Sequence, residues 1–242
     1  MLHRQALLIG NCALAVLLAA CGGPAALPDI GGGGGAGGGG GGGGGDGGGG
    51  TPVSPFTAPT EQQALYFRND LPDDMDAVQG AYNQGGRTPF GDLPTGAAVS
   101  YAGFMEVLFT STPNANISSA ATLSVDMQTG ATTGSATAFM GYVYNSETDS
   151  TELALYEGGI TFLGATLTSS SGNANIDIEI DGAFDNGVQQ FTIAGNIDGP
   201  IYGPNADGLY ASGNYFGLGQ EITLTADGVP VYGSATLWAL SE

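Results

Sequence analysis

The stretch IDIEID, residues 176–181, decides the fold class, because isoleucine and acidic residues alternate strictly along it. A period of two places alternate side chains on opposite faces of an extended chain, so the isoleucines face a core and the acids face water. The turn formers DNG at 185–187 tolerate positive φ and follow soon afterwards. The stretch therefore predicts a half-buried β-strand that leads into a turn.

The same period recurs from residue 93 to residue 242. Short polar turns between the runs favour an antiparallel meander, since parallel crossovers need longer connections. Closure removes exposed edges, and a barrel of about eight strands has an interior that side chains can fill. We therefore predict an all-β fold, a single antiparallel up-and-down β-barrel, over residues 93–242. The predicted turns are QTG (128–130), GG (158–159), SGN (171–173), DNG (185–187) and ADG (226–228), and the glycines expected at bends are Gly103, Gly134, Gly141, Gly164, Gly195 and Gly213.

Residues 1–20 have the layout of a bacterial export signal. Arg4 supplies a positive charge, and the apolar run from Ala6 to Ala20 is shorter than the roughly 20 residues that span a bilayer. The sequence LAAC at 18–21 resembles the lipobox of bacterial lipoproteins, in which the cysteine is acylated and becomes the first residue after cleavage. The resemblance makes Cys21 the candidate lipidation site. An ordinary signal peptide that happens to contain a cysteine is the alternative.

A lipid at Cys21 would make a membrane the first partner of the chain, because several acyl chains together give stable anchoring. In lipoproteins, aspartate after the cysteine tends to mean retention at the inner membrane, and here the residue is Gly22. We therefore expect localisation at a bacterial outer membrane. The sequence does not distinguish the cell surface from the periplasmic face of that membrane.

Residues 21–60 form a predicted disordered tether. Residues 31–50 are glycine except for Ala36 and Asp46, and such a tract has no side chains to bury. Prolines at 52, 55 and 59 stiffen its end. Residues 61–92 mix acids with turn formers, and we expect an irregular ancillary segment there, because no convincing helical period is visible in the chain.

Charge and composition exclude several kinds of chemistry. The chain has 23 acids, no lysine and a formal net charge of −20. After cleavage before Cys21 it would keep only Arg68 and Arg87 as cations, with no histidine and no free thiol. Nucleophilic Ser-His-Asp and Cys-His sites are then excluded, as are His/Cys zinc sites and internal disulfides. We expect no cofactor and no metal. We also expect no nucleic-acid partner, because phosphate recognition needs basic clusters.

Two acidic stretches invite a calcium interpretation. Asp70, Asp73, Asp74 and Asp76 supply oxygen ligands but lack regular loop spacing, so a solvated acidic loop is favoured. DIEIDG at 177–182 imitates the start of an EF-hand loop, but its twelfth position is Val188 instead of a glutamate. The isoleucines between its acids predict a strand with an acidic outer face.

Three segments resemble the β-barrel domain of transferrin-binding protein B, which also occurs in small bacterial lipoproteins described as transferrin-binding-protein-like solute-binding proteins. They are LPTGAAVSYAGF (93–104), LSVDMQTGATTGSAT (123–137) and GPIYGPNADGLYASGNYFG (199–217). The matching positions are Tyr101 and Gly103, Asp126 and Gly134, and Tyr202, Gly203, Pro204, Ala206 and Gly213. The chain departs from the family pattern at 207–211. The family proper has two lobes and this chain has room for one barrel, so transferrin binding does not follow.

The leading functional expectation is a monomeric, non-catalytic module that binds a protein or a small solute, with metal or iron acquisition implied by the resemblance alone. A structural or masking coat protein without a ligand is one alternative, and a two-carboxylate glycosidase is another. The acids considered for catalysis are Glu106, Glu152, Glu157 and Asp126, although solvated strand positions explain them better. The aromatic side chains considered as contact anchors are Tyr142, Tyr144, Tyr156, Tyr202, Tyr210, Tyr215 and Phe216. For each ring, a core or strand-stacking role is favoured over a contact role.

Overall fold

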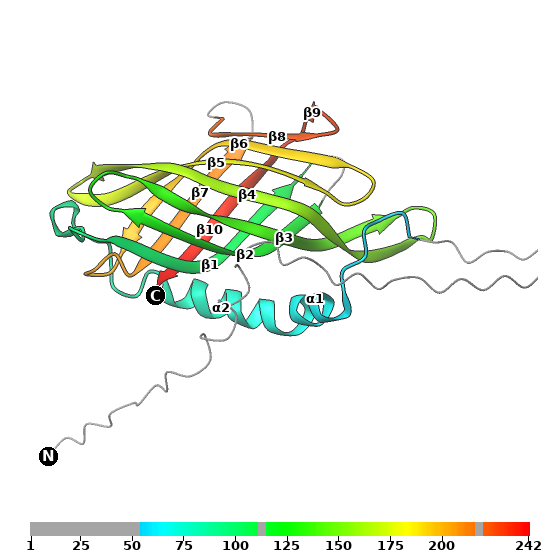
Figure 1. The fold of residues 1–242 in the computed structure, drawn as a ribbon, viewed down its shortest axis with the longest axis horizontal. Helices are drawn as coiled ribbons and strands as arrows, with labels where there is room; N and C mark the ends of the chain where they lie inside the picture. Colours follow the sequence, from blue (N-terminus) through cyan, green and yellow to red (C-terminus); the bar gives the residue numbers. More distant parts are fainter. Residues whose placement is uncertain (1–53, 111–114, 216–219) are drawn as a thin grey trace, which may run out of the picture. The chain divides into compact units, whose positions relative to one another are not determined.

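The computed structural model describes residues 54–110, 115–215 and 220–242. Figure 1 shows a barrel of strands with a helical segment along one side. The strands are β1 (Ala98–Phe109), β2 (Ala115–Asp126), β3 (Thr132–Asn145), β4 (Ser150–Ser170), β5 (Asn173–Asp185), β6 (Gln190–Tyr202), β7 (Gly208–Tyr215), β8 (Ile222–Ala226), β9 (Val229–Pro230) and β10 (Gly233–Ser241). The helices are α1 (Glu61–Leu65), the π-helix η1 (Tyr66–Asp70), α2 (Leu71–Ala81) and the short 3-10 helix η2 (Phe90–Asp92).

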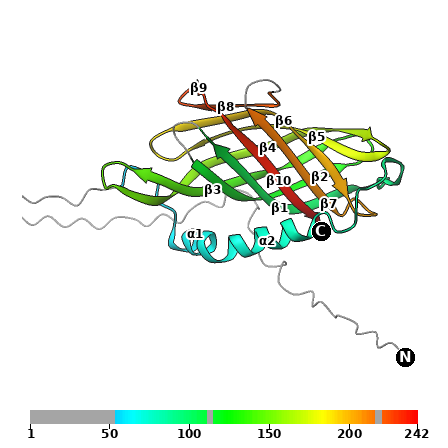
Figure 2. The ribbon, with the colours of Figure 1, turned by 180° about the vertical axis from the view of Figure 1, so that it is seen from behind.

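Eight strands close into a ring, which confirms the predicted antiparallel barrel. The order runs from β5 through β4, β3, β2 and β1 to β10, β7 and β6, and an additional pairing of β5 with β6 closes it. Figure 2 shows β10 from behind, between β1 and β7. Strand β6 has two partners on the same edge: its residues 198–202 pair with β7, and its residues 191–195 pair with β8. The hairpin of β8 and β9 therefore extends the wall beside the first half of β6.

The interior of the barrel is filled with apolar side chains. Ile176, Ile178 and Ile180 of β5 are 0–1% exposed, as the alternation predicted, whereas the acids between them lie on the outer face. An aromatic cluster packs the inside of the barrel, with ring centroids 4.9–6.5 Å apart: Phe109, Phe139, Tyr156, Phe184 and Phe191. The barrel is therefore a packed core held by the hydrophobic effect.

The predicted turns are mostly confirmed. Ser171 and Gly172 both have positive φ between β4 and β5, and Asp227 and Gly228 do the same between β8 and β9, as tight hairpins require. The predicted turn at 158–159 is wrong, because β4 continues through these two glycines. A Cβ at residue 159 would lie 2.4 Å from the backbone oxygen of Ala136, so glycine allows close strand approach there.

The prediction of irregular structure over residues 61–92 is wrong for most of that segment. Residues 61–81 form the continuous helical run of α1, η1 and α2, which begins at a capping box between Thr60 and Gln63. Leu71 is 3% exposed, and the rings of Tyr82 and Tyr210 stack with centroids 5.8 Å apart. The helix thus packs on the outside of the barrel wall. Among the described residues, no helix is both long and apolar enough to cross a bilayer.

Two extended segments attach to the rims of the barrel. Thr88 is fully buried between the ends of β5 and β6, where its amide donates to the Ile201 carbonyl at 2.9 Å and its carbonyl accepts from the Ala174 amide at 2.8 Å. Near the other end of β5, the Thr57 amide donates to the Asn186 carbonyl at 2.7 Å. Phe56 packs against the core, so the expected tether is ordered where it reaches the barrel.

Candidate functional site

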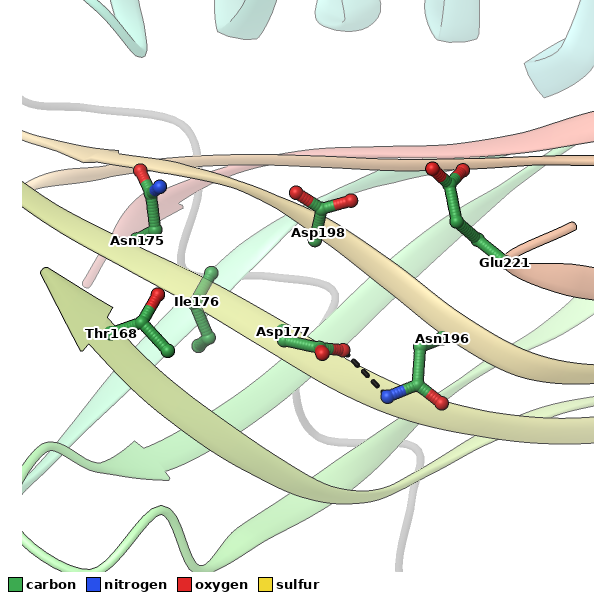
Figure 3. Close-up of a pocket in the computed structure, with 7 residues that line it drawn as sticks. All are labelled: Thr168, Asn175, Ile176, Asp177, Asn196, Asp198 and Glu221. Atoms are coloured by element: carbon green, nitrogen blue, oxygen red, sulfur yellow. Dashed lines mark hydrogen bonds between the residues drawn. The ribbon is translucent and has the colours of Figure 1, made fainter. Parts of the chain in front are cut away.

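A shallow acidic groove lies on the outer face of β5, β6 and the start of β8 (Figure 3). Asp177 of β5 stands directly opposite Asp198 of β6 in the antiparallel register. Glu221, just before β8, approaches the same region because its carbonyl accepts the Asn196 amide at 2.8 Å. The groove has a volume of about 370 Å³ and is lined by Thr168, Asn175, Ile176, Asp177, Asn196, Asp198 and Glu221.

The groove concentrates negative charge. Desolvation, followed by the carboxylates of Glu221 and Asp177, raises the pKa of Asp198 above its ordinary value of 3.8. Asn196 Nδ2 donates to Asp177 Oδ1 at 2.6 Å, and Figure 3 shows the Asp177 carboxylate pointing toward Asn196. Such a groove attracts cations. Even so, the described part of the chain contains no group of three acids, histidines or cysteines placed to hold a metal ion.

An aromatic patch lies on the outer face of the β3–β4 hairpin. Tyr142 and Tyr144 are 49% and 59% exposed, and Leu153 of β4 pairs directly opposite Tyr142. The ring of Phe67, from η1, meets Tyr142 edge-on with centroids 5.8 Å apart. The Tyr144 hydroxyl donates to Asp149 Oδ1 at 2.6 Å, and this bond raises the pKa of Tyr144. We call Phe67, Tyr142, Tyr144 and Leu153 the β3–β4 patch.

A groove runs beside this patch, between the helix and the barrel wall. Its helical side carries Arg68, Pro72, Asp76 and Gln79 at intervals of about one turn, and Phe67, Leu71 and Met75 complete the helical lining. The barrel supplies Ser118 of β2 and Tyr142 of β3, and the volume is about 350 Å³. Apolar and polar side chains therefore converge here from the helical run of η1 and α2 and from the β2–β3 hairpin.

The four acids considered for catalysis are dispersed. Asp126 Oδ1 accepts the Gln128 amide at 2.8 Å in the β2–β3 turn, which lowers its pKa. Glu152 of β4 lies near the other end of β3, where hydrogen bonds from the Ser54 side chain and then from Asn145 lower its pKa. Glu106 accepts from Asn116 on the outer face of β1 and β2. Each of these three has a local hydrogen-bonding role in the wall or in a turn.

The fourth acid, Glu157, is exposed on β4, where it stands opposite Asp185 in the register. Asp185 Oδ1 accepts the Gly187 amide at 2.6 Å, so this second carboxylate also organises a turn. The structure thus brings Glu157 close to an acid that was not considered for catalysis, and it does not group the four that were.

The calcium candidates are placed on regular elements. Asp73 and Asp74 lie in the first turn of α2, where carboxylates favour the positive end of the helix dipole. The predicted solvated loop over residues 70–76 is therefore wrong, since these residues belong to η1 and α2. The interpretation of DIEIDG as a strand is confirmed, because residues 177–182 lie within β5.

The aromatic candidates divide into three groups. Tyr142 and Tyr144 are exposed as contact anchors would be. Tyr156 is fully buried in the core, where burial raises the pKa of its hydroxyl and Asn186 acts in the opposite direction. The rings of Tyr202 and Tyr210 contact Tyr82 from the helical segment, and Tyr215 contacts Tyr232. Phe216 lies outside the described residues, as do Cys21 and the expected signal segment.

Sequence reasoning missed several exposed apolar residues. Tyr232 and Val229 are 54% and 63% exposed around the β8–β9 hairpin, and Leu163 is 51% exposed on β4. The alternation of inward and outward residues along a strand indicates which residues face outward, but it does not say which outward faces are covered by other elements. The groove beside the helix was missed for the same reason.

Comparison with known proteins returned no match among family models, curated proteins or solved structures.

Proposed function

We propose that the chain is a bacterial lipoprotein, anchored to the outer membrane through Cys21, whose barrel is a non-catalytic binding module. The LAAC sequence at 18–21, the charged and apolar run before it and the glycine tract after it support the anchoring. The β-barrel supplies a rigid scaffold on which surface residues are held in place.

The observation that carries the binding proposal is the contrast between a filled interior and an uneven exterior. The inward side chains of β5 and its neighbours are at most a few per cent exposed, so a ligand has to bind outside the barrel. On the exterior, half-exposed tyrosines gather beside a groove of about 350 Å³. A surface of this kind suits a protein or peptide more than an enclosed small solute.

The resemblance to the transferrin-binding protein B barrel enters this proposal through two of its motifs. Tyr101, from the first motif, donates its hydroxyl to the carbonyl of Ala206, from the third motif, at 2.7 Å. Ala206 has a φ of 59° and is fully buried, which gives the pair a specific geometry. The two motifs are thus in contact at the rim, and the family relationship rests on the sequence resemblance and supplies no ligand.

A coat protein without a ligand is the second candidate. The described residues hold 21 of the 23 acids and only two arginines, and a dense negative surface of this kind keeps proteins soluble and apart. Such a protein would need no apolar patch. The β3–β4 patch is therefore the feature that favours the binding module.

The anchoring is tested by expressing the full chain and its Cys21→Ser variant in a bacterium that processes lipoproteins. The native chain should fractionate with outer membranes and carry acyl chains on an N-terminal cysteine in the mass spectrum. The variant should lose both properties. An unacylated mature chain would contradict the proposal.

Binding is tested separately with the acylated full chain in zwitterionic nanodiscs. The loaded discs are exposed to growth medium or host fluid, and empty discs serve as the control. Saturable capture of one species supports a binding module. Capture that never saturates, or that equals the empty discs, favours the coat protein.

A further inference from the structure

The β3–β4 patch and the groove beside it have the features of a docking surface. Tyr142 and Tyr144 project from alternate positions of one strand, so both rings lie on the outer face. Phe67 and Leu153 extend the apolar area on either side of Tyr142. Aromatic side chains that are held in place by neighbours bind partners with little loss of conformational entropy.

The dimensions limit what can occupy the groove. Its helical side extends from Arg68 to Gln79, a rise of about 16 Å at 1.5 Å per residue. An extended peptide covers this length with about five residues. The groove is also open to solvent beside Tyr142, which is 49% exposed, so a chain can enter from the side.

Charge decides between the remaining occupants. The described residues hold two arginines against 21 acids, and acids lie at both ends of the surface: Asp76 lines the groove and Asp149 holds Tyr144. A second copy of this chain would meet strong like-charge repulsion, and so would an anionic lipid surface. A positively charged segment is attracted by the same field.

We propose that this surface binds a short basic segment of another protein, whose apolar or aromatic side chains pack against Tyr142 and whose cationic groups lie near Asp76 and Asp149. This inference rests on the proposed binding function and names the class of partner. Arg68 lies on the same groove and disfavours a cation next to it, so the basic residues of the partner sit toward the two acids. The apolar contacts supply affinity and the charges supply orientation.

The test uses two pentapeptides, acetyl-Trp-Arg-Leu-Arg-Trp-amide and its counterpart with glutamate in place of arginine. Each carries a fluorescent label, and its anisotropy is titrated with the acylated full chain in zwitterionic nanodiscs, against empty discs. The basic peptide should bind, the acidic one should not, and affinity should fall as salt rises from about 50 to 300 mM. Equal binding of the two peptides, or no binding, overturns the inference.

Two variants locate the site. Tyr142→Ser should weaken binding of the basic peptide about tenfold, and Tyr144→Ser should weaken it by a similar or smaller factor. Leu163→Ser is the matched control, because it removes a half-exposed apolar side chain from another part of β4 and should leave affinity within about twofold. Unchanged melting temperatures show that the three variants are folded. Equal losses in all three variants overturn the inference.

Failure of this inference is distinguishable from failure of the proposed function. If the native chain captures a species from medium or host fluid saturably, and Tyr142→Ser captures it equally well, the binding function stands and the patch is not its site. If nothing is captured and neither peptide binds, both proposals are wrong.

Discussion

Two outward faces of the same barrel differ in what covers them. Along β5, strict alternation leaves Asp177, Glu179 and Asp181 at the surface. Along β1, Phe104 points outward but is only 7% exposed, and its neighbour Met105 faces the core. Both faces of β1 are therefore buried at this point. The helix α2 packs over β1 and β10 (Figure 1), whereas the helical segment that contacts β5 in the described part of the chain is the short 3-10 helix η2, next to the start of the strand.

The difference shows up in the composition of the two strands. β5 reads as alternating apolar and acidic residues, as expected of a wall with one face in water. Residues 102–109 of β1 are AGFMEVLF, nearly continuous in apolar character, as expected of a strand buried on both faces. The helix therefore covers only part of the barrel wall, and the loss of strict alternation in β1 indicates which part it covers.

The largest effect should come from breaking the inner face of the exposed wall. Ile178→Asp places a carboxylate in a fully buried position without a partner, so we expect a loss of about 4 kcal/mol in unfolding free energy. Urea denaturation measures it. Glu179→Gln, one residue along and facing water, is the control and should stay within about 0.5 kcal/mol. Similar losses for both would mean that the period was misassigned.

A second large effect is expected from the covered outer face. Phe104→Ala removes a buried ring from the outward face of β1, the strand over which α2 packs, and should cost about 3 kcal/mol, as a core substitution would. Leu163→Ala, at a 51% exposed outer position, should cost about 0.5 kcal/mol or less. Equal melting temperatures for the two variants would mean that the outward faces of β1 and β4 are equally covered, which would contradict the difference between the two walls.

A smaller loss should follow from pushing the helix away from the barrel. A Cβ at residue 208 would lie 1.8 Å from the Tyr82 carbonyl oxygen, so Gly208→Ala should cost about 2 kcal/mol by forcing a backbone shift. Gly80→Ala has open space around it and should instead stabilise α2 by about 0.5 kcal/mol. Thermal unfolding followed by circular dichroism distinguishes the two, and opposite signs are the required result.

The smallest effect concerns the exposed acidic wall and depends on pH. Because the folded state raises the pKa of Asp198, ionisation of that carboxyl destabilises the fold as pH rises through the folded pKa. Asp198→Asn should therefore stabilise the protein near pH 7, by less than about 1 kcal/mol, and lose this advantage below the ordinary pKa of 3.8. Stability curves between pH 3 and pH 7 test this, and a constant or inverted difference would contradict it.

The sequence predicted the barrel because its inner face follows a period of two, as in Ile176 to Ile180, and because turn residues such as Gly172 and Gly228 have the conformations that their type favours. It did not predict the helix, since Leu71, Met75 and Val78 are spaced by one turn within a segment crowded with aspartate and glycine. The candidate site was predicted only through Tyr142 and Tyr144. Its groove depends on how the helical run of η1 and α2 meets the β2–β3 hairpin, which no local pattern encodes.

The claim that α2 covers one part of the barrel wall is tested most directly by native-state hydrogen exchange on the full chain. A helix as short as α2 is marginal in water by itself, so protection of its amides reports docking on the barrel. We expect amides near the end of α2 to exchange at least about a thousandfold more slowly than in an unstructured peptide. They include the amide of Tyr82, which donates to the Val78 carbonyl at 2.9 Å. Exchange within about tenfold of the unstructured rate would contradict it.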